Sequence, residues 1–273
     1  MKKLILLIGF ILFLGCIDQS EDVSLLPREE VLEIHENNIS GEISIDFQNY
    51  NGFLEVHIWD KPSYRVELVK WARATTSEEA KKTAENLKVD FSEDMEAGGI
   101  TLVLETEEKI TAGVEVTAYL PGMSFETVDL STFNGDMWLD DVTASDVSLT
   151  CANGDIRGSA TADTIRVKTS NGKVQGFYQG NDVTIETTNG RIDIECGEYG
   201  EYDIGTTNGD IDVIVAGDFK FNLKTTMGDI FIEADDVVYI LDDRDHKKGY
   251  TAEDYQVVVA ASTTMGSVTV VKR

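Results

Sequence analysis

One short pattern recurs along the second half of the chain and constrains the fold more than any other feature. In its clearest copy, from Val183 to Ile194, the order is apolar, any, apolar, any, Thr, any, Asn-Gly, any, apolar, any, apolar. Seven copies centre on pairs that are spaced by 19, 18, 18, 19, 19 and 38 residues. A fixed short period is typical of a solenoid, in which each repeat covers the open face of the next. Because the last spacing is two periods, we expect one corner of the stack to have been overwritten. The pairs are Asn134-Gly135, Asn153-Gly154, Asn171-Gly172, Asn189-Gly190, Asn208-Gly209, Met227-Gly228 and Met265-Gly266.

Apolar residues alternate with period two on both sides of each pair, which predicts two strands per repeat, each with one buried face. In the copy at Asn189, these residues are Val183, Ile185, Ile192 and Ile194. The position two residues before the Asn or Met has the same inward parity, and its side chain can hydrogen-bond to its neighbours or to the turn backbone. It is occupied by Thr132, Cys151, Thr169, Thr187, Thr206, Thr225 and Thr263.

Asn-Gly pairs commonly close two-residue hairpins, but a chain of hairpins forms a meander. A meander has no reason to keep an 18–19-residue register over seven copies. We therefore predict an all-β fold, a single-stranded parallel β-helix with one repeat per coil. Asn and Gly then supply a left-handed backbone at each corner, and stacked corners place the Asn side chains in a ladder at intervals of about 4.8 Å. The predicted ladder residues are Asn134, Gly135, Asn153, Gly154, Asn171, Gly172, Asn189, Gly190, Asn208, Gly209, Gly228 and Gly266.

The first sixteen residues predict a targeting segment. Lys2 and Lys3 precede an apolar run over residues 4–14, which is too short for a membrane-spanning helix of about 20 residues. The sequence Phe-Leu-Gly-Cys that ends at Cys16 resembles the lipobox of prokaryotic lipoproteins. The resemblance implies that Cys16 carries a lipid and that the mature protein is anchored at the cell membrane, facing outside the cytoplasm. An ordinary signal peptide or an uncleaved anchor, with a chance cysteine, is the alternative.

Between the targeting segment and the regular coils the sequence is less periodic. The polar, acidic stretch after Cys16 predicts a tether. Asn51-Gly52 follows the positions of the repeat and predicts an early coil, separated from the others by a long insertion. Within that insertion, Thr76-Ser77-Glu78-Glu79 is a capping box, which predicts a helix. The predicted parts are 1–16 (signal peptide), 17–38 (tether) and a solenoid domain over 39–273, divided into irregular coils at 39–125, with a helix at about 77–88, and regular coils at 126–273.

Three motifs carry a resemblance to a known family. They are the rungs of the form Thr-x-Asn-Gly-Asp-Ile, as at 206–211, the sequence Glu78-Glu79-Ala80 before Leu87-Lys88-Val89, and Tyr119-Leu120-Pro121 before the first regular rung. Over about residues 40 to 273 the chain resembles the toast-rack family of adhesin-like domains of unknown function, from bacterial and archaeal envelopes. The resemblance implies a β-solenoid fold and supplies no catalytic motif.

Composition bounds the remaining function classes. At 273 residues and 42% apolar content, the chain can bury a substantial core. Its formal net charge of −27 repels nucleic acid, so we expect no nucleic-acid partner. The same charge keeps a repetitive β surface soluble, which explains the acidity without a site for a particular ligand.

We recognise no catalytic, cofactor-binding or metal-binding motif. The three histidines, His35, His57 and His246, are far apart and lack metal-ligand spacing. Some β-helices are polysaccharide lyases or hydrolases, which cluster Asp with Lys or Arg on one coil face. The position two residues after the Asn or Met does carry a row of mixed charges, and ion pairs Asp155–Lys173 and Arg191–Asp210 between coils are a sufficient explanation for it. The row reads Asp136, Asp155, Lys173, Arg191, Asp210, Asp229 and Ser267.

Two cysteines follow the targeting segment. Cys151 occupies the inward threonine position, and Cys196 lies two coils later in another column. Two coils separate stacked backbones by about 9.6 Å, whereas a disulfide needs α-carbons within about 7 Å of each other. We therefore predict that both thiols are free.

The most plausible function is a surface-anchored envelope lipoprotein whose solenoid binds or scaffolds a partner, without catalysis. Its expected partners are the membrane, through the lipid, and an envelope glycan or protein. The alternatives are an envelope polysaccharide lyase or hydrolase and an accessory to an envelope-stress signalling system. In solenoids, specificity tends to lie in insertions that interrupt the rungs. The largest one here is residues 242–254, for which a charged loop or a flap over the open sheet end is the structural alternative. Its candidate recognition residues are Arg244, His246, Lys247, Lys248 and Tyr250.

Overall fold

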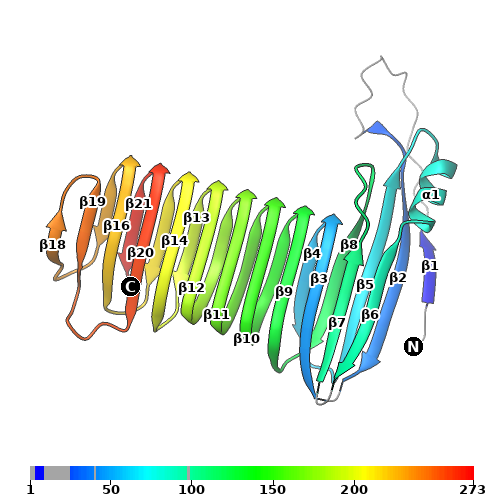
Figure 1. The fold of residues 1–273 in the computed structure, drawn as a ribbon, viewed down its shortest axis with the longest axis horizontal. Coiled ribbons are helices and arrows are strands. Elements are labelled where there is room, and N and C mark those ends of the chain that lie inside the picture. Colours follow the sequence, from blue (N-terminus) through cyan, green and yellow to red (C-terminus); the bar gives the residue numbers. More distant parts are fainter. Residues whose placement is uncertain (1–3, 9–24, 40, 97–98) are drawn as a thin grey trace.

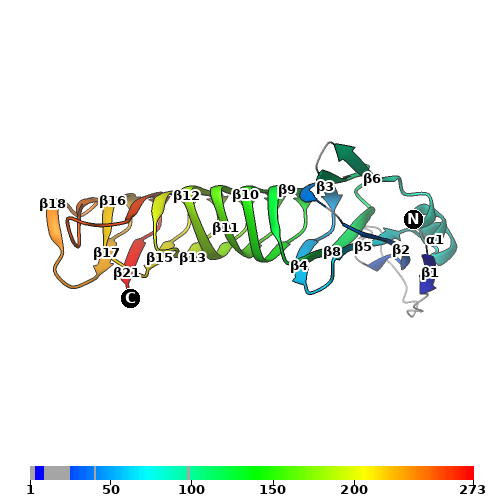
Figure 2. The ribbon, with the colours of Figure 1, turned by 90° about the horizontal axis from the view of Figure 1, so that it is seen from below.

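A computed structural model describes residues 4–8, 25–39, 41–96 and 99–273. It is a long, flat solenoid whose strands stack from an N-terminal region beside α1 to a hairpin of β18 and β19 at the other end (Figure 1). Seen from below, the strands lie in two facing rows (Figure 2). The predicted all-β solenoid is confirmed. The elements are β1 (Leu4–Ile8), β2 (Arg28–Asn38), β3 (Glu42–Asn51), β4 (Leu54–Trp59), β5 (Ser63–Arg73), α1 (Ser77–Glu85), β6 (Val89–Glu96), β7 (Gly99–Thr106), β8 (Ala112–Pro121), β9 (Ser124–Asn134), β10 (Met137–Asn153), β11 (Ile156–Asn171), β12 (Val174–Asn189), β13 (Ile192–Cys196), β14 (Gly200–Asn208), β15 (Ile211–Val215), β16 (Phe219–Met227), β17 (Ile230–Glu233), β18 (Val238–Asp242), β19 (His246–Tyr250), β20 (Val257–Met265) and β21 (Val268–Lys272).

Each regular coil contributes one strand to each row. We call the row whose strands lead into the Asn-Gly or Met-Gly corners sheet A, and the row whose strands leave those corners sheet B. β10, β11 and β12 belong to both, because each begins on sheet B and continues on sheet A of the next coil. From β3 to β16 in the spatial order of sheet A, adjacent strands run parallel to each other, as a solenoid requires. In spatial order, sheet A is β6, β7, β3, β9, β10, β11, β12, β14, β20, β16, β19, β18, and sheet B is β1, β2, β5, β8, β4, β10, β11, β12, β13, β15, β21, β17.

The inward side chains of both sheets fill one continuous core. In the coil at Asn189, the predicted inward residues Val183, Ile185, Ile192 and Ile194 are all buried. Each such side chain contributes roughly 1.5–3 kcal/mol by leaving water. Because every coil repeats these contacts, the stack of coils is held mainly by apolar packing.

The last coil of the chain is not the last coil of the stack. β20 lies between β14 and β16 on sheet A, and β21 lies between β15 and β17 on sheet B. The prediction of an overwritten corner in a sequential stack is therefore wrong. After β17 the chain forms β18 and β19, and then returns to fill a place that it left open between the coil of β14 and β15 and the coil of β16 and β17. Asp218 holds this return, because its carboxylate accepts hydrogen bonds from the Thr251 hydroxyl (2.7 Å) and the Lys272 ammonium (2.6 Å).

The charged stretch 242–254 is largely part of a hairpin instead of an irregular loop. β19 pairs antiparallel with β16, and β18 pairs antiparallel with β19. The hairpin therefore closes the C-terminal end of sheet A, as the structural alternative of a flap supposed. Edge strands that cover the last parallel strand limit pairing with other chains.

The N-terminal end is closed by strands outside the repeat. β6 and β7 extend sheet A, while β2, β5 and β8 extend sheet B. Helix α1 packs on β2 and β5 and buries Ala80 and Ala84. Its N-cap hydroxyl, on Thr76, accepts the N–H of Glu79 at 3.2 Å, as the capping box predicts. The helix ends at Glu85, slightly before the predicted boundary.

The predicted targeting segment and tether are only partly described. Cys16 lies outside the described residues, and residues 4–8 form β1, antiparallel to β2. Residues 28–38, predicted as tether, form β2, which the sequence conceals because only Val31 and His35 of this strand are buried. Within the ranges that the structure describes, we find no helix with the length and hydropathy needed to cross a bilayer.

Candidate functional site

The side-chain amides of the corner asparagines form a hydrogen-bonded ladder. Each Nδ2 donates to the Oδ1 of the asparagine in the preceding coil, over 2.6 to 2.9 Å. At the first coil, the Asn51 amide donates to the Ala112 carbonyl at 3.2 Å. At the other end, the Asn208 Oδ1 is buried and has no hydrogen-bond partner in the described structure, because the next coil carries Met265. The ladder runs through Asn51, Asn134, Asn153, Asn171, Asn189 and Asn208.

The corners do not use the left-handed asparagine backbone that the sequence suggests. Among the described residues, the non-glycine residues with positive φ are Asp141 and Asp236, and neither is at a corner. The corner glycines are required mainly by close approach of the coils. A Cβ on Gly190 would lie 1.8 Å from the carbonyl oxygen of Gly172, and a Cβ on Gly172 would lie 1.9 Å from that of Gly154. Such distances exclude any side chain unless the coils separate.

The inward threonines bond to the same glycines. Thr187 donates its hydroxyl to the Gly172 carbonyl of the preceding coil at 3.1 Å, and the other threonines of this column do the same. Cys151 occupies the column with its Sγ 3.3 Å from the Gly135 carbonyl oxygen. Burial raises the pKa of the Cys151 thiol to about 11, so the proton stays on sulfur at neutral pH. Cys151 and Cys196 are both free, as predicted, and both are buried.

The mixed-charge row pairs differently from the prediction. The expected pairs Asp155–Lys173 and Arg191–Asp210 are not among the ion pairs of the described residues. Instead, an Asp155 carboxylate oxygen accepts the backbone N–H of Lys173 at 2.9 Å, which joins consecutive coils. The row is therefore explained by backbone capping and by pairs between adjacent columns. The observed pairs are Arg157–Asp155 (3.0 Å) and Arg191–Asp212 (2.7 Å).

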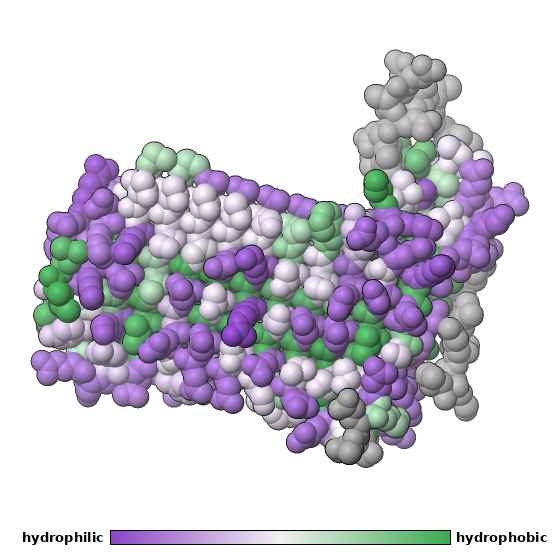
Figure 3. Space-filling view, viewed as in Figure 1, coloured by the Kyte–Doolittle hydropathy of each residue, from purple (hydrophilic) through white to green (hydrophobic). Residues whose placement is uncertain are grey.

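The candidate recognition residues lie on or beside the terminal hairpin. Most of them contact neighbouring residues of the chain, and Lys248 is exposed. Hydrophobic side chains gather at this end of the molecule (Figure 3), where Val238, Tyr239 and Ile240 of β18 are exposed. The contacts are Arg244 with Asp229 (3.4 Å), His246 with Asn222 (2.9 Å), Lys247 with Asp242, and Tyr250 paired in register with Val238.

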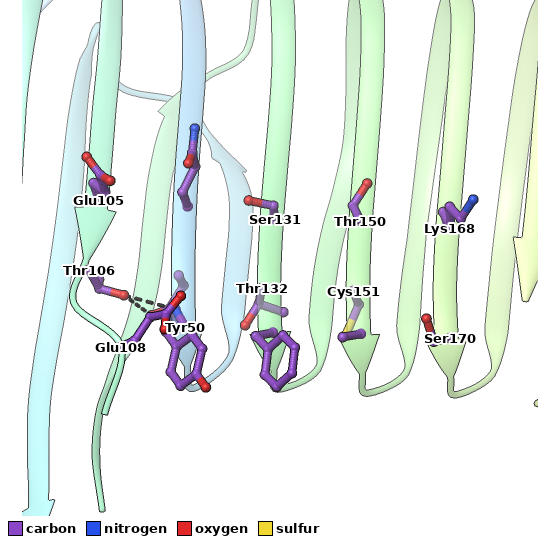
Figure 4. A pocket seen from close by; sticks show the side chains of 14 residues that line it. Tyr50, Glu105, Thr106, Glu108, Ser131, Thr132, Thr150, Cys151, Lys168 and Ser170 are labelled. Atoms are coloured by element: carbon purple, nitrogen blue, oxygen red, sulfur yellow. Dashed lines mark hydrogen bonds between the residues drawn. The ribbon is translucent and has the colours of Figure 1, made fainter. Parts of the chain in front are cut away.

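A pocket of about 460 Å³ lies on the outer surface of sheet A, across β7, β3, β9, β10 and β11. Glu105, Ser131, Thr150 and Lys168 form a row across neighbouring strands, and Tyr50 lies nearer the corners (Figure 4). This row presents a carboxylate, two hydroxyls and an ammonium group, each on a different strand. This surface can therefore offer both donors and acceptors to a bound molecule.

Two stacked aromatic rings stand within this pocket. We call the outward position just before each corner Asn or Met the pre-corner position. Tyr50 and Phe133 occupy it on adjacent coils, with ring centroids 5.1 Å apart and planes at 4°. Phe133 is 48% exposed. The next two coils carry Ala152 and Ser170 at the same position, so the ring stack ends at Phe133.

No motif in the sequence indicates this pocket. Its aromatic residues are 83 positions apart, and no spacing rule joins them. The available signal was that Tyr50 and Phe133 both immediately precede a corner asparagine, in a column that otherwise holds small side chains.

The histidines remain separate, as their spacing suggests. The His57 Nδ1 lies 2.7 Å from a carboxylate oxygen of Asp140, and its ring stacks on Tyr119 with centroids 5.6 Å apart. Burial tends to raise the pKa of Asp140, but hydrogen bonds with His57 and Trp138 outweigh it and hold that pKa below its usual value. Across the described ranges, no group of three or more His, Cys, Asp or Glu side chains is arranged to hold a metal ion.

Comparisons with known proteins give a family and several distant structures. The family model described as Toastrack DUF4097 matches residues 10–271. No curated protein matches the sequence significantly. Similar solved structures include a putative cell adhesion protein from Clostridium sporogenes ATCC 15579 (12% identity, 90% of this chain and 100% of that chain, TM-score 0.40), a putative adhesin from Parabacteroides distasonis ATCC 8503 (10% identity, 89% and 97%, TM-score 0.45) and a putative adhesin from Bacteroides fragilis NCTC 9343 (11% identity, 88% and 96%, TM-score 0.34).

Proposed function

We propose, since this chain belongs to the Toastrack DUF4097 family, that it is an envelope lipoprotein whose β-solenoid binds or scaffolds a partner outside the cytoplasm. In this proposal a lipid on Cys16 anchors the mature protein at the membrane. The solenoid then extends from the anchor as a rigid body with two long faces. Catalysis is not part of the proposal.

The pocket around Tyr50 and Phe133 is the observation that carries the binding role. Most residues of the regular coils are explained by folding, because they fill the core or join one corner to the next. The exposed Phe133 ring is not explained in this way, since it points out of the core and stands beside polar side chains. Exposed aromatic rings with polar neighbours in a concave surface are typical of binding sites.

The terminal hairpin is the alternative recognition surface. Arg244 and Lys248 are exposed there on a molecule whose formal net charge is −27. The pairing of the hairpin with β16 favours an end-closing role over recognition, so the pocket is the primary candidate. The two surfaces lie at opposite ends of the regular coils and can be tested independently (Figure 1).

The binding role is tested by capturing envelope components from a native membrane fraction with the full-length protein. The wild type should retain at least one partner. Phe133→Ala should lose it, while an Arg244→Ala/Lys248→Ala variant should keep it. If the wild type retains nothing above a denatured control, the binding function is wrong. The reverse pattern of losses would place recognition at the hairpin.

The anchor is tested by Cys16→Ser and cell fractionation. The variant should leave the membrane fraction or remain as an unprocessed precursor. Unchanged membrane association of a normally cleaved Cys16→Ser protein would exclude a lipid on this residue.

A further inference from the structure

The stack of rings in the pocket leaves one ring-sized place unfilled. At the pre-corner position the successive coils carry Tyr50, Phe133, Ala152 and Ser170. The first two rings are nearly parallel and 5.1 Å apart, which is close to the spacing of about 4.8 Å between coils. A third ring would therefore stand over Ala152, whose methyl side chain leaves that place open.

The size of this place is set by the coil spacing. Ser170 lies two coils beyond Phe133, so their α-carbons are separated by about 9.6 Å. A single six-membered ring that stacks on Phe133 at the usual 3.5–4 Å contact distance fits between Phe133 and Ser170. Phe133, Ala152 and Ser170 all line the same pocket of about 460 Å³.

Polar groups border this place on two sides. Ser131, Thr150 and Lys168 lie in the neighbouring outward column, on the coils of Phe133, Ala152 and Ser170. Their hydroxyl and ammonium groups can each donate to a ligand oxygen. Lys168 lies at the outer border of this place, where its ammonium pairs with Glu186 of the next coil, with Nζ and Oε2 3.1 Å apart. The Ser170 hydroxyl closes the far side.

We propose that this place binds a neutral pyranose residue of a glycan, stacked on the outer face of Phe133 over Ala152. The inference rests on the proposed binding function and names its ligand class. A pyranose ring has an apolar C–H face that can pack on an aromatic ring. Its equatorial hydroxyls lie roughly in the plane of the ring and point away from its centre. Those hydroxyls would meet Ser131, Thr150 and Lys168, while the opposite face of the sugar would meet the Ser170 hydroxyl.

The charge and chemistry of the surroundings favour a neutral sugar over other flat ligands. Glu105 and Glu108 line the same pocket beyond Tyr50, and the chain has a formal net charge of −27. An anionic sugar is therefore repelled by all but one of the nearby charges. A purely aromatic ligand would cover the hydroxyls of Ser131 and Thr150 without offering them hydrogen bonds, which costs affinity.

The test uses the full-length protein and a panel of soluble neutral oligosaccharides built from hexoses and N-acetylhexosamines. Ala152→Phe places the protein's own ring in the vacant position and should weaken binding at least about tenfold, as should Phe133→Ala. Thr207→Phe is the matched control, because it adds the same ring at an exposed pre-corner position three coils beyond Ala152 in the stack. It should bind as the wild type does. Circular dichroism and thermal unfolding of each variant separate loss of the site from loss of the fold.

The outcomes distinguish this inference from the function that it extends. If the wild type captures an envelope partner but binds none of the neutral oligosaccharides, the pyranose site is wrong and the binding function stands. Glycan binding that survives Ala152→Phe in a folded protein would also overturn the site. If the wild type binds neither envelope components nor oligosaccharides, the proposed function itself fails.

Discussion

At the scale of single residues, each corner joins two coils through three different groups. The asparagine amide bonds to the amide of the coil before, the threonine hydroxyl bonds to the preceding glycine carbonyl, and the glycine allows the backbones to meet. A hydrogen bond of this kind contributes about 1 kcal/mol, and a ladder of aligned amides strengthens each member. The repeated geometry of the corner therefore depends on residue size as much as on hydrogen bonding.

Gly190→Ala tests the close approach of the corners. The added Cβ would lie 1.8 Å from the Gly172 carbonyl oxygen, so the coils must separate, and we expect a loss of about 3 kcal/mol or more in the free energy of unfolding. Gly205→Ala is the control, because a Cβ there meets no atom within 4 Å. It should change stability by less than about 1 kcal/mol, with a gain expected from reduced freedom of the unfolded chain. Urea unfolding measures both, and equal effects would refute the close-approach explanation.

Two buried tyrosines, Tyr178 and Tyr202, differ in the hydrogen bonding of their hydroxyls. The Tyr178 hydroxyl is buried and has no hydrogen-bond partner among the described residues, whereas the Tyr202 hydroxyl donates to the Tyr178 carbonyl and accepts the N–H of Gly197, both at 2.9 Å. Removing an unsatisfied buried hydroxyl should cost nothing, so Tyr178→Phe should preserve or raise the free energy of unfolding by up to about 1 kcal/mol. Tyr202→Phe should lower it by about 1 kcal/mol, because it removes the hydrogen bonds of the hydroxyl, while the Gly197 N–H and the Tyr178 carbonyl remain bonded to each other at 3.0 Å. Chemical denaturation of the two variants would contradict this assignment if Tyr178→Phe were the more damaging.

At the scale of elements, the order of the last three coils is the main feature that the sequence does not reveal. The coils ending at Met227 and Met265 both carry Met at the corner and Thr at the inward position, so either can follow the coil ending at Asn208. The regular 19-residue spacing points to Met227, yet the structure places Met265 next to Asn208. Only the long-range pairing of β20 with β14 resolves the order.

Extending the asparagine ladder by one residue tests this order. Met265→Asn would place an amide beside the unpaired Asn208 Oδ1 and should raise the free energy of unfolding by about 1 kcal/mol. Met227→Asn is the matched control, because its neighbour in the stack is Met265 and offers no amide. We expect no gain from it. A stabilising Met227→Asn together with a neutral Met265→Asn would indicate that the coils stack in sequence order.

Other elements show why part of the fold and the site escaped prediction. The coil register was readable because buried positions repeat every 18 or 19 residues, as at Val183 and Ile185. The strand β2 could not be read from the sequence, because Val31 and His35 are its buried residues and give no clear alternation. The pocket was not readable either, because Tyr50 and Phe133 become neighbours only when a long insertion folds onto the N-terminal side of β3 and β4 and leaves β9 to pair with β3. Local pattern thus specified the repeating unit, and long-range contacts specified its ends.

At the scale of the whole molecule, structural and recognition roles occupy different residues. The corners and the core repeat along the stack and hold neighbouring coils together. The pocket interrupts this regularity at the first two coils of sheet A, on β3 and β9 beside β7. We infer that stability and binding can be changed separately, since few residues belong to both sets.

The most direct test compares two variants, Asn189→Ala and Phe133→Ala. For each, it measures the free energy of unfolding and the fraction of folded protein that retains the envelope partner. Asn189→Ala should cost about 1–2 kcal/mol, because it breaks hydrogen bonds with Asn171 and Asn208, and should leave binding by the folded protein unchanged. Phe133→Ala should change the free energy of unfolding by no more than about 1 kcal/mol and should abolish binding. Loss of binding by folded Asn189→Ala, or retained binding by Phe133→Ala, would contradict the account.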